Sequence, residues 1–173
     1  MSSVPADRRT GMEADHVIAS TTIEAAPEAV FAVLADPSAH AEIDGTGWVR
    51  AALDGDRITA AGQVFRMAMY HDNHPEKDYE IANLVEVCDE PRAIAWRPGT
   101  ASPDDGELSF GGWTWRYDLE AASPSRTTVT LTYDWSAVPP EIRARIPFPP
   151  FPPEHLDHSL HHLADLVVRR LPR

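Results

Sequence analysis

The 173-residue sequence contains one cysteine, Cys88, one lysine, Lys77, and no run of basic residues. A single cysteine excludes an intrachain disulfide and a zinc site built from several thiolates. The chain is strongly acidic, with 15 Lys+Arg against 27 Asp+Glu and a formal net charge of -12. Because an acidic chain without a basic patch repels phosphate groups, we expect neither nucleic acid nor an anionic membrane surface as a partner.

Long hydrophobic runs are also missing. No stretch reaches the roughly 18 apolar residues that span a bilayer, and the N-terminal residues lack the apolar core of a secretory signal. These absences predict a cytoplasmic protein without stable membrane insertion. The motifs G-x-G-x-x-G, G-x-S-x-G and the P-loop are absent as well, so no phosphate-binding loop or nucleophile motif marks an active site.

The composition that remains is that of a globular domain. The apolar share is 43%, which suffices for an ordinary core, and the length suits one domain. Residues 1–15 are polar and lack periodicity, so we expect a flexible tail followed by a single domain over 16–173. Residues 1–90 hold 17 acids and 6 bases, a charge of -11 that we interpret as a solubility feature.

Hydrophobic periodicity predicts mostly strands. Alternating β-branched residues predict a strand over 16–24, and a helix begins at Pro27 and ends before Asp36-Pro37, followed by a short helix over 38–43. Turn residues then separate six further expected strands, at 47–54, 57–71, 78–88, 91–97, 111–121 and 126–136. The loops between these strands are short, which favours antiparallel pairing.

The end of the chain combines a proline-rich segment with a helix. Seven of the 16 prolines fall within 139–153, which excludes regular helix and central strand there. Residues 154–171 have a helical period, with acids in the first turn and arginines in the last. The predicted fold class is α+β, with one antiparallel sheet curled around one long helix.

Five segments occur in a recognisable order: residues 23–31 (IEAAPEAVF), 34–37 (LADP), 90–96 (EPRAIAW), 113–117 (WTWRY) and 127–132 (TTVTLT). With the amphipathic C-terminal helix, this set resembles the START/Bet v1-like (SRPBCC) superfamily, in its polyketide cyclase/dehydrase-like branch, over about residues 16–171. The resemblance implies a helix-grip fold, in which a curved seven-stranded sheet grips the last helix and leaves a cavity for small, largely apolar ligands. It does not fix an activity, because members include aromatase/cyclases, lipid carriers, hormone receptors and co-chaperone domains.

Strand alternation indicates which side chains face this cavity. The predicted ligand-binding residues of the strands are Phe65, Met67, Met69, Asn83, Trp96, Trp113, Trp115, Tyr117 and Tyr133. The apolar face of the last helix adds Leu156, Leu160 and Leu163. Phe148 and Phe151, in the proline-rich segment, are expected to cover the cavity entrance.

Polar side chains on the predicted inner face are the candidates for orienting a ligand or for acid/base work. They are Gln63, His71, Asn83, Tyr117 and Tyr133. Burying an unpaired polar group costs about 1–3 kcal/mol, so each must find a partner in the ligand, the backbone or water. No pair is marked clearly enough to name a catalytic mechanism.

Three histidines follow one stripe of the last helix. His155, His158 and His162 are spaced i, i+3, i+7, and Asp165 continues the stripe, a spacing that would permit a metal site. The stripe lies beside the leucine face, so we expect no metal but a solvated helix edge or a contact with a second copy, as in a homodimer. Cys88 is expected on the face opposite the cavity, which argues against thiol catalysis.

Three functions remain open at this point. The first is binding of a hydrophobic small molecule, such as a lipid, a polyketide-like compound or an aromatic metabolite. The second is an aromatase/cyclase or dehydratase-like enzyme that folds a poly-β-ketone and moves protons on it. The third is a co-chaperone-like interaction domain that uses the acidic first half or the proline-rich segment. No cofactor is expected.

Overall fold

Alternating burial along the strands produces a sheet with one apolar face. In β9 (Arg126–Asp134), Thr127, Val129, Leu131 and Tyr133 are buried, whereas the residues between them are only partly buried. Successive side chains of a strand point to opposite faces, so this pattern gives the sheet one face toward the core. These strands come from a computed structural model, which describes residues 10–12, 15–72 and 74–172.

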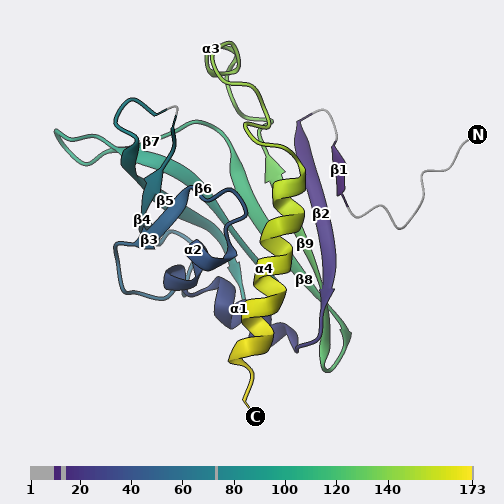
Figure 1. The fold of residues 1–173 in the computed structure, drawn as a ribbon. Helices are drawn as coiled ribbons and strands as arrows, with labels where there is room; N and C mark the ends of the chain where they lie inside the picture. Colours follow the sequence, from purple (N-terminus) through teal and green to yellow (C-terminus); the bar gives the residue numbers. More distant parts are fainter. Residues whose placement is uncertain (1–9, 13–14, 73, 173) are drawn as a thin grey trace, which may run out of the picture.

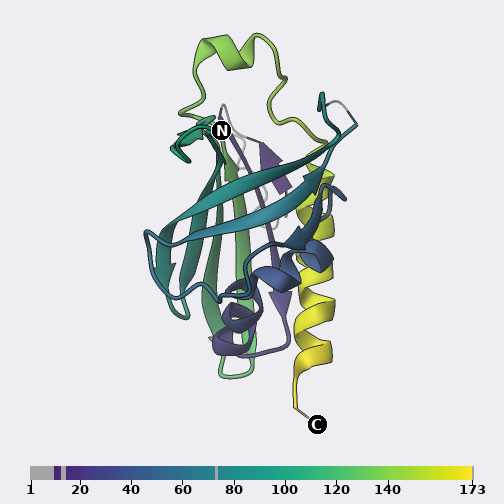
Figure 2. The same cartoon turned by 90° about the vertical axis from the view of Figure 1, so that its left-hand side faces the viewer.

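The described residues form one antiparallel sheet, in the order β1-β2-β9-β8-β6-β5-β4-β3, with β7 paired to β6 off this path (Figure 1). The remaining strands are β1 (Thr10–Met12), β2 (His16–Ile23), β3 (Val49–Ala52), β4 (Val64–Tyr70), β5 (Asp78–Asp89), β6 (Ala93–Ala101), β7 (Leu108–Phe110) and β8 (Thr114–Ser123). Figure 2 shows β4 and β5 crossing the other strands obliquely, so the sheet is curved.

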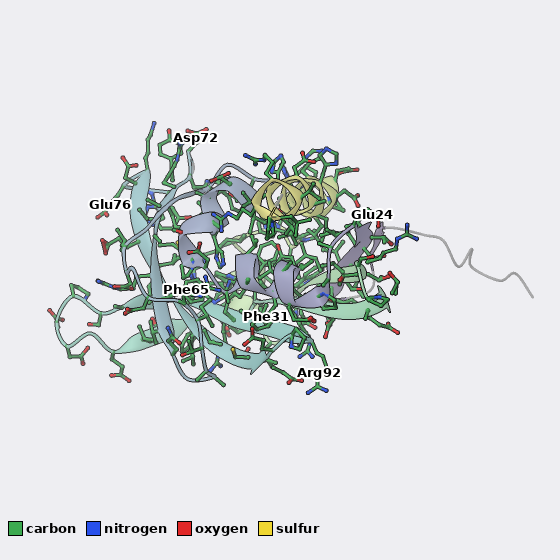
Figure 3. The ribbon with its side chains drawn as sticks, turned by 90° about the horizontal axis from the view of Figure 1, so that it is seen from below. Glu24, Phe31, Phe65, Asp72, Glu76 and Arg92 are labelled. Atoms are coloured by element: carbon green, nitrogen blue, oxygen red, sulfur yellow. The ribbon has the colours of Figure 1, made fainter. Side chains whose placement is uncertain are left out.

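Most of the helical segments lie on the concave side of this sheet. These are α1 (Pro27–Leu34), a 3-10 turn (Pro37–Ala39), α2 (His40–Ile43) and α4 (Glu154–Arg170). Helix α4 packs against β2, α1 and α2, and its charged ends match the helix dipole. Figure 3 looks along α4, with Phe31 and Phe65 inside the molecule and Glu24, Asp72 and Arg92 at its edge. The predicted α+β helix-grip fold is confirmed.

Three short elements lie where the sequence predicted none. Strand β7 forms between the strands expected at 91–97 and 111–121, and it pairs with β6. Strand β1 pairs with β2 inside the segment expected to be a tail, while residues 1–9 and 13–14 lie outside the described residues. Helix α3 (Pro140–Arg143) lies in the proline-rich segment that was expected to exclude helix. That expectation was wrong because Pro140 occupies the first turn, where a missing N–H costs nothing.

A β-bulge in β5 changes the face on which Cys88 lies. The register shifts between Val85 and Val87, after which Cys88 is opposite the fully buried Ile94. Directly opposed residues share a face of the sheet, so Cys88 points inward and not outward as predicted. It is partly buried against the core, where burial and the neighbouring carboxylates of Glu90 and Asp89 raise the pKa of the thiol.

No helix within the described ranges is long and apolar enough to cross a membrane. Helix α4 has 17 residues, yet its sequence alternates leucines with charged residues and histidines. Its apolar side is a stripe that faces the sheet.

Candidate functional site

A cavity of about 680 Å³ lies between the inner face of the sheet, the α2–β3 connection and residues 139–153, which we call the strap. Each boundary contributes aromatic rings. The α2–β3 connection supplies Trp48, and the strap supplies Phe148 and Phe151. The wall is therefore mostly apolar, as in typical small-molecule sites of 300–1,000 Å³.

Strand register brings most of the predicted site residues together. Trp96 lies opposite Trp115, and Trp115 lies opposite Tyr133, so three strands place these rings on one face. The predicted residues that line the cavity are His71, Met67, Met69, Asn83, Trp96, Trp113, Trp115, Tyr117 and Tyr133. Their role in binding a ligand stays a prediction.

Four predicted ligand-binding residues do not line the cavity. Leu156, Leu160 and Leu163 are almost fully buried where α4 packs on β2 and α1, so they belong to the core beside the cavity. Phe65 is buried behind the wall, with its ring centroid 5.4 Å from that of His40 and 5.5 Å from that of Trp96. Periodicity identifies an inward face without distinguishing packed from open space, so these four residues are inward but outside the lining, and their role in binding stays a prediction.

Gln63 is not an inward polar group either. Residues 57–63, predicted as part of a strand, form a loop before β4, and the Gln63 amide braces it. Its Oε1 accepts from the backbone N–H of Thr59 at 2.9 Å, and its Nε2 donates to the carbonyl oxygen of Arg57 at 2.7 Å. Gln63 thus satisfies backbone groups of the loop and contributes nothing to the cavity wall.

Asn83 is the one polar side chain of the wall with an orphaned buried atom. It is 2% exposed, and its Oδ1 has no hydrogen-bond partner in the part of the chain that the structure describes. Asn83 lies opposite Phe65 on β4 and Pro98 on β6, neither of which offers a side-chain donor. An unsatisfied buried amide is costly, so it suggests a partner that is absent from the chain itself.

His40 lines the cavity, and the sequence did not indicate it. The side chain is 8% exposed, stacks on Trp96 at 5.1 Å between ring centroids, and its Nε2 is 2.8 Å from the carbonyl oxygen of Leu34. Burial lowers the pKa of the imidazole, against the weaker opposing effects of its bond to Leu34 and the Asp36 and Asp44 carboxylates. The one sequence signal was that His40 and Ile43 are three residues apart in a predicted helix, so the two side chains share a helix face.

Two tyrosines give the wall phenol groups. Burial raises the pKa of Tyr133, and burial together with the Asp44 carboxylate raises the pKa of Tyr117. Both hydroxyls therefore stay protonated at physiological pH and can donate hydrogen bonds. Tyr117 also lies against Trp96, with 6.1 Å between the ring centroids.

The histidine stripe of α4 contacts the end of α2 and the α2–β3 connection. His155 Nδ1 lies 2.8 Å from the carbonyl oxygen of Gly45, His162 Nδ1 lies 3.3 Å from that of Ile43, and the Ser159 hydroxyl accepts from the Gly45 N–H at 2.8 Å. The expected solvated edge is thus partly an intramolecular contact. Among the described residues, no group of three or more His, Cys, Asp or Glu is placed to hold a metal ion.

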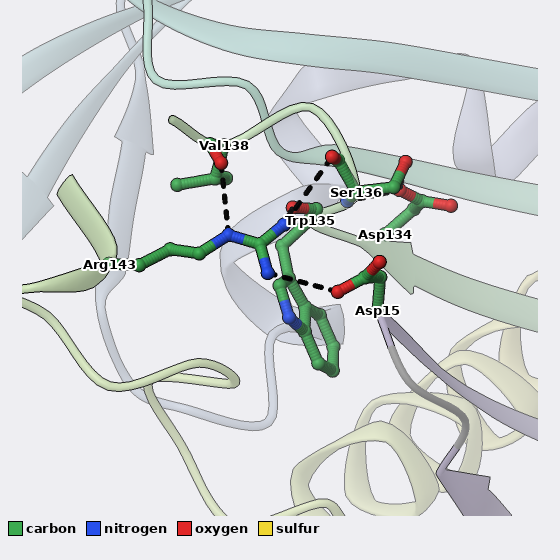
Figure 4. A network of polar contacts seen from close by, with 6 residues as sticks. All are labelled: Asp15, Asp134, Trp135, Ser136, Val138 and Arg143. Atoms are coloured by element: carbon green, nitrogen blue, oxygen red, sulfur yellow. Dashed lines mark hydrogen bonds and ion pairs between the residues drawn. The ribbon is translucent and has the colours of Figure 1, made fainter. Parts of the chain in front are cut away.

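The strap lies over the aromatic wall and is anchored at its start. Phe151 stacks on Trp115 with 5.6 Å between centroids, and Phe148 lies 5.9 Å from Trp113. Arg143 donates from Nε to the carbonyl oxygen of Val138 at 2.9 Å and from Nη2 to that of Trp135 at 2.8 Å (Figure 4). Its Nη1 pairs with the Asp15 carboxylate at 3.0 Å. These contacts hold one end of the strap to β9 and to the segment before β2.

A curved antiparallel sheet packed against a long C-terminal helix defines the helix-grip class of folds. Solved structures with this arrangement include protein Ms6760 from Mycobacterium smegmatis, with a TM-score of 0.66 and 14% identity over 94% of this chain and 98% of that one. Norcoclaurine synthase of Thalictrum flavum, solved with a transition-state analogue, has a TM-score of 0.60 at 10% identity, over 89% and 94% of the chains. The Aha1 dimer from Colwellia psychrerythraea has a TM-score of 0.54 at 14% identity, over 88% of this chain and 95% of that one. Such low identities establish the fold alone.

Sequence comparison adds two relatives from Mycobacterium tuberculosis, both described as uncharacterised. The protein Rv0088 of Mycobacterium tuberculosis is 32% identical over 114 residues, which is 65% of this chain and 45% of the relative. The match therefore spans less than half the length of the curated relatives. No family model matches the chain.

Proposed function

We propose that the protein binds a hydrophobic small molecule in the cavity between the sheet and the strap. The observation that carries the proposal is the orphaned Asn83 amide in the wall of an aromatic cavity of about 680 Å³. A buried amide oxygen without a donor is costly to the protein. A ligand that lies in the cavity and donates a hydrogen bond to Asn83 Oδ1 removes this cost, so the arrangement favours a binding site.

An aromatase/cyclase or dehydratase-like enzyme is the second candidate. Two wall residues favour this candidate because one can accept a proton and the other can donate one. His40 is neutral and has an unpaired Nδ1, whereas Tyr117 keeps its hydroxyl proton. Such a pair could accept and donate protons on a polyketide-type substrate. Norcoclaurine synthase is an enzyme with this fold, which makes catalysis compatible with it. A co-chaperone-like role, proposed from the sequence, has no need of a cavity.

The chain carries its own reporters for a binding test. Of its five tryptophans, all within the described residues, Trp48, Trp96, Trp113 and Trp115 line the cavity. We expect native mass spectrometry of the purified protein to find a co-purified small molecule. We also expect the neutral dye N-phenyl-1-naphthylamine to bind saturably, with energy transfer from tryptophan.

A variant that fills the cavity provides the control. Met67→Trp places an indole in the wall, whereas Ala68→Trp places one on the other face of the same strand. Dye binding should weaken at least tenfold in Met67→Trp and stay unchanged in Ala68→Trp. The proposal is overturned if the protein carries no small molecule and the dye does not bind saturably, or if both variants bind it like the original chain.

A further inference from the structure

Three polar side chains of the cavity are grouped around one indole. Trp96 stacks on His40 at 23° between ring planes and lies 6.1 Å from Tyr117. Phe65, which lies opposite Asn83 in the sheet, contacts the rings of both His40 and Trp96. His40, Asn83 and Tyr117 therefore form a polar patch around Trp96, while the rest of the wall is mainly apolar.

The hydrogen bond to Leu34 determines which proton His40 carries. A backbone carbonyl oxygen can only accept, so the Nε2 that lies 2.8 Å from it must be the protonated nitrogen. The neutral ring then has a lone pair on Nδ1, while the hydrogen bond that His40 makes to the described residues is the one through Nε2. His40 thus offers a ligand an acceptor and no donor.

The charges near this patch oppose an anionic ligand. Among the residues described, Asp44 and Arg145 are the lining residues with a permanent charge. The Asp44 carboxylate is fixed by the Thr46 hydroxyl at 2.8 Å and the Val49 N–H at 3.0 Å, and it acts on Tyr117. Arg145 belongs to the strap, where its Nε bonds to the carbonyl oxygen of Glu141. No cation stands beside Asn83, His40 and Tyr117 in the described wall.

From these contacts we infer that the ligand is a neutral aromatic compound of several fused rings with a hydroxyl group, a phenol or an enol. Its O–H donates to one of the two unpaired acceptors, His40 Nδ1 or Asn83 Oδ1, and its oxygen accepts from the Tyr117 hydroxyl. A hydroxyl both donates and accepts, which suits this mixed set, whereas a ketone or carboxylate leaves Nδ1 unpaired. The indoles of the wall favour flat rings. This inference rests on the proposed binding function and narrows its ligand class.

Three matched probes separate the inference from the function on which it rests. They are 9-phenanthrol, 9-methylphenanthrene and phenanthrene-9-carboxylate, measured at pH 7.5 by displacement of N-phenyl-1-naphthylamine. The hydroxyl compound should bind about tenfold more tightly than the methyl compound, the usual value of one good hydrogen bond, and the carboxylate should bind most weakly. If none displaces the dye and none binds directly, the binding function fails. If the methyl compound or the carboxylate binds as tightly as the phenol, only the inference fails.

Variants then test the assigned residues. His40→Phe keeps a ring against Trp96 and removes Nδ1, and Asn83→Leu replaces the amide with an apolar group of the same shape. In each, the preference for 9-phenanthrol over 9-methylphenanthrene should fall to about threefold or less. Thr132→Val, a polar-to-apolar change on the outer face of β9, should keep the full preference. An unchanged preference in both His40→Phe and Asn83→Leu overturns the inference, and the second variant decides the matter if the first does not fold.

Discussion

At the scale of single residues, the cavity depends on a few polar atoms in an apolar wall. Asn83 is directed by strand alternation to the inner face, where its Oδ1 has no donor among the described residues. His40 is held by one bond to Leu34 and by stacking on Trp96. Both residues cost the free protein stability, since one is unpaired and the other must remain uncharged.

Replacing Asn83 should therefore stabilise the free protein. Asn83→Leu keeps the shape of the side chain and removes the unpaired amide, so the free energy of unfolding should rise by about 1–3 kcal/mol. For a chain of this size, each kcal/mol raises Tm by roughly 2–4 °C. Differential scanning calorimetry of ligand-free protein measures the change. A lower Tm would mean that the amide has a stabilising partner.

His40 should make stability depend on pH below neutrality. Because burial lowers its pKa in the folded state, the unfolded chain takes up a proton near the ordinary histidine value of 6.5 and the folded chain does not. The free energy of unfolding should consequently decrease as pH falls from 6.5 toward the lower folded-state pKa, by up to about 1.4 kcal/mol per pH unit. Urea unfolding between pH 7.5 and 5 measures this slope, which should become shallower in His40→Phe. Equal slopes in both proteins would contradict it.

Sequence patterns predicted some of these residues and missed others for a physical reason. Asn83, Tyr117 and Tyr133 lie in long strands whose period of two assigns the face directly. His40 lies in a four-residue helix, too short for a period, and its ring partners Phe65 and Trp96 are 25 and 56 positions away. Its place in the wall is a property of tertiary packing.

At the scale of elements, α4 is held against the α2–β3 connection by backbone contact. The Gly45 N–H donates a hydrogen bond to the Ser159 hydroxyl of α4, and the Gly45 carbonyl oxygen bonds with the His155 ring of the same helix. A Cβ on Gly45 would lie against the His155 carbonyl oxygen and 2.9 Å from Ser159 Oγ. The approach of these two elements therefore requires glycine at this position.

Gly45→Ala should destabilise the fold more than a similar change elsewhere. The new methyl group meets helix backbone that cannot rotate away, so we expect a loss of about 1–3 kcal/mol, as for other overpacked sites. Gly55→Ala is the matched control, because a Cβ there meets nothing within 4 Å. Chemical denaturation of both variants provides the comparison. Equal stabilities would show that the two elements separate easily.

The sequence predicted the bounds of helices and strands best where the hydrophobic pattern repeats over many residues, and worst in the proline-rich segment. Helix α4 and β5, β8 and β9 lie close to their expected bounds, because each repeats its pattern over at least nine residues. The short helix α3 has no such repeat. The bulge between Val85 and Val87, which turns Cys88 inward, also leaves no mark in the pattern of apolar residues.

At the scale of the whole molecule, the strap joins distant parts of the chain around one cavity. Arg143 links the strap to the end of β9 and to Asp15. Phe151 links it to Trp115 of β8, and Phe148 to Trp113 just before β8. Figures 1 and 2 show α3, at the start of the strap, standing clear of the sheet. The fold class followed from the order of elements, whereas the volume under the strap depends on contacts that no local pattern encodes.

Loosening the strap should speed ligand exchange. Arg143→Met removes the guanidinium bonds, so N-phenyl-1-naphthylamine should dissociate about threefold to tenfold faster, equivalent to the loss of about one net hydrogen bond. Arg126→Met is the control, because Arg126 also pairs with a carboxylate, that of Glu24, but at the opposite end of β9. Stopped-flow fluorescence measures both rates. Equal acceleration in the two variants, or none in Arg143→Met, would contradict the anchoring role.

The pairing of Asp15 with Arg143 has a practical consequence for handling the protein. Asp15 lies beside the anchor of the strap, whereas the end of α4 lies at the opposite end of the molecule (Figure 1). A fluorescent label attached at position 15 would thus perturb uptake and release of small molecules. The same label attached after the end of α4, at position 171, would leave the entrance undisturbed.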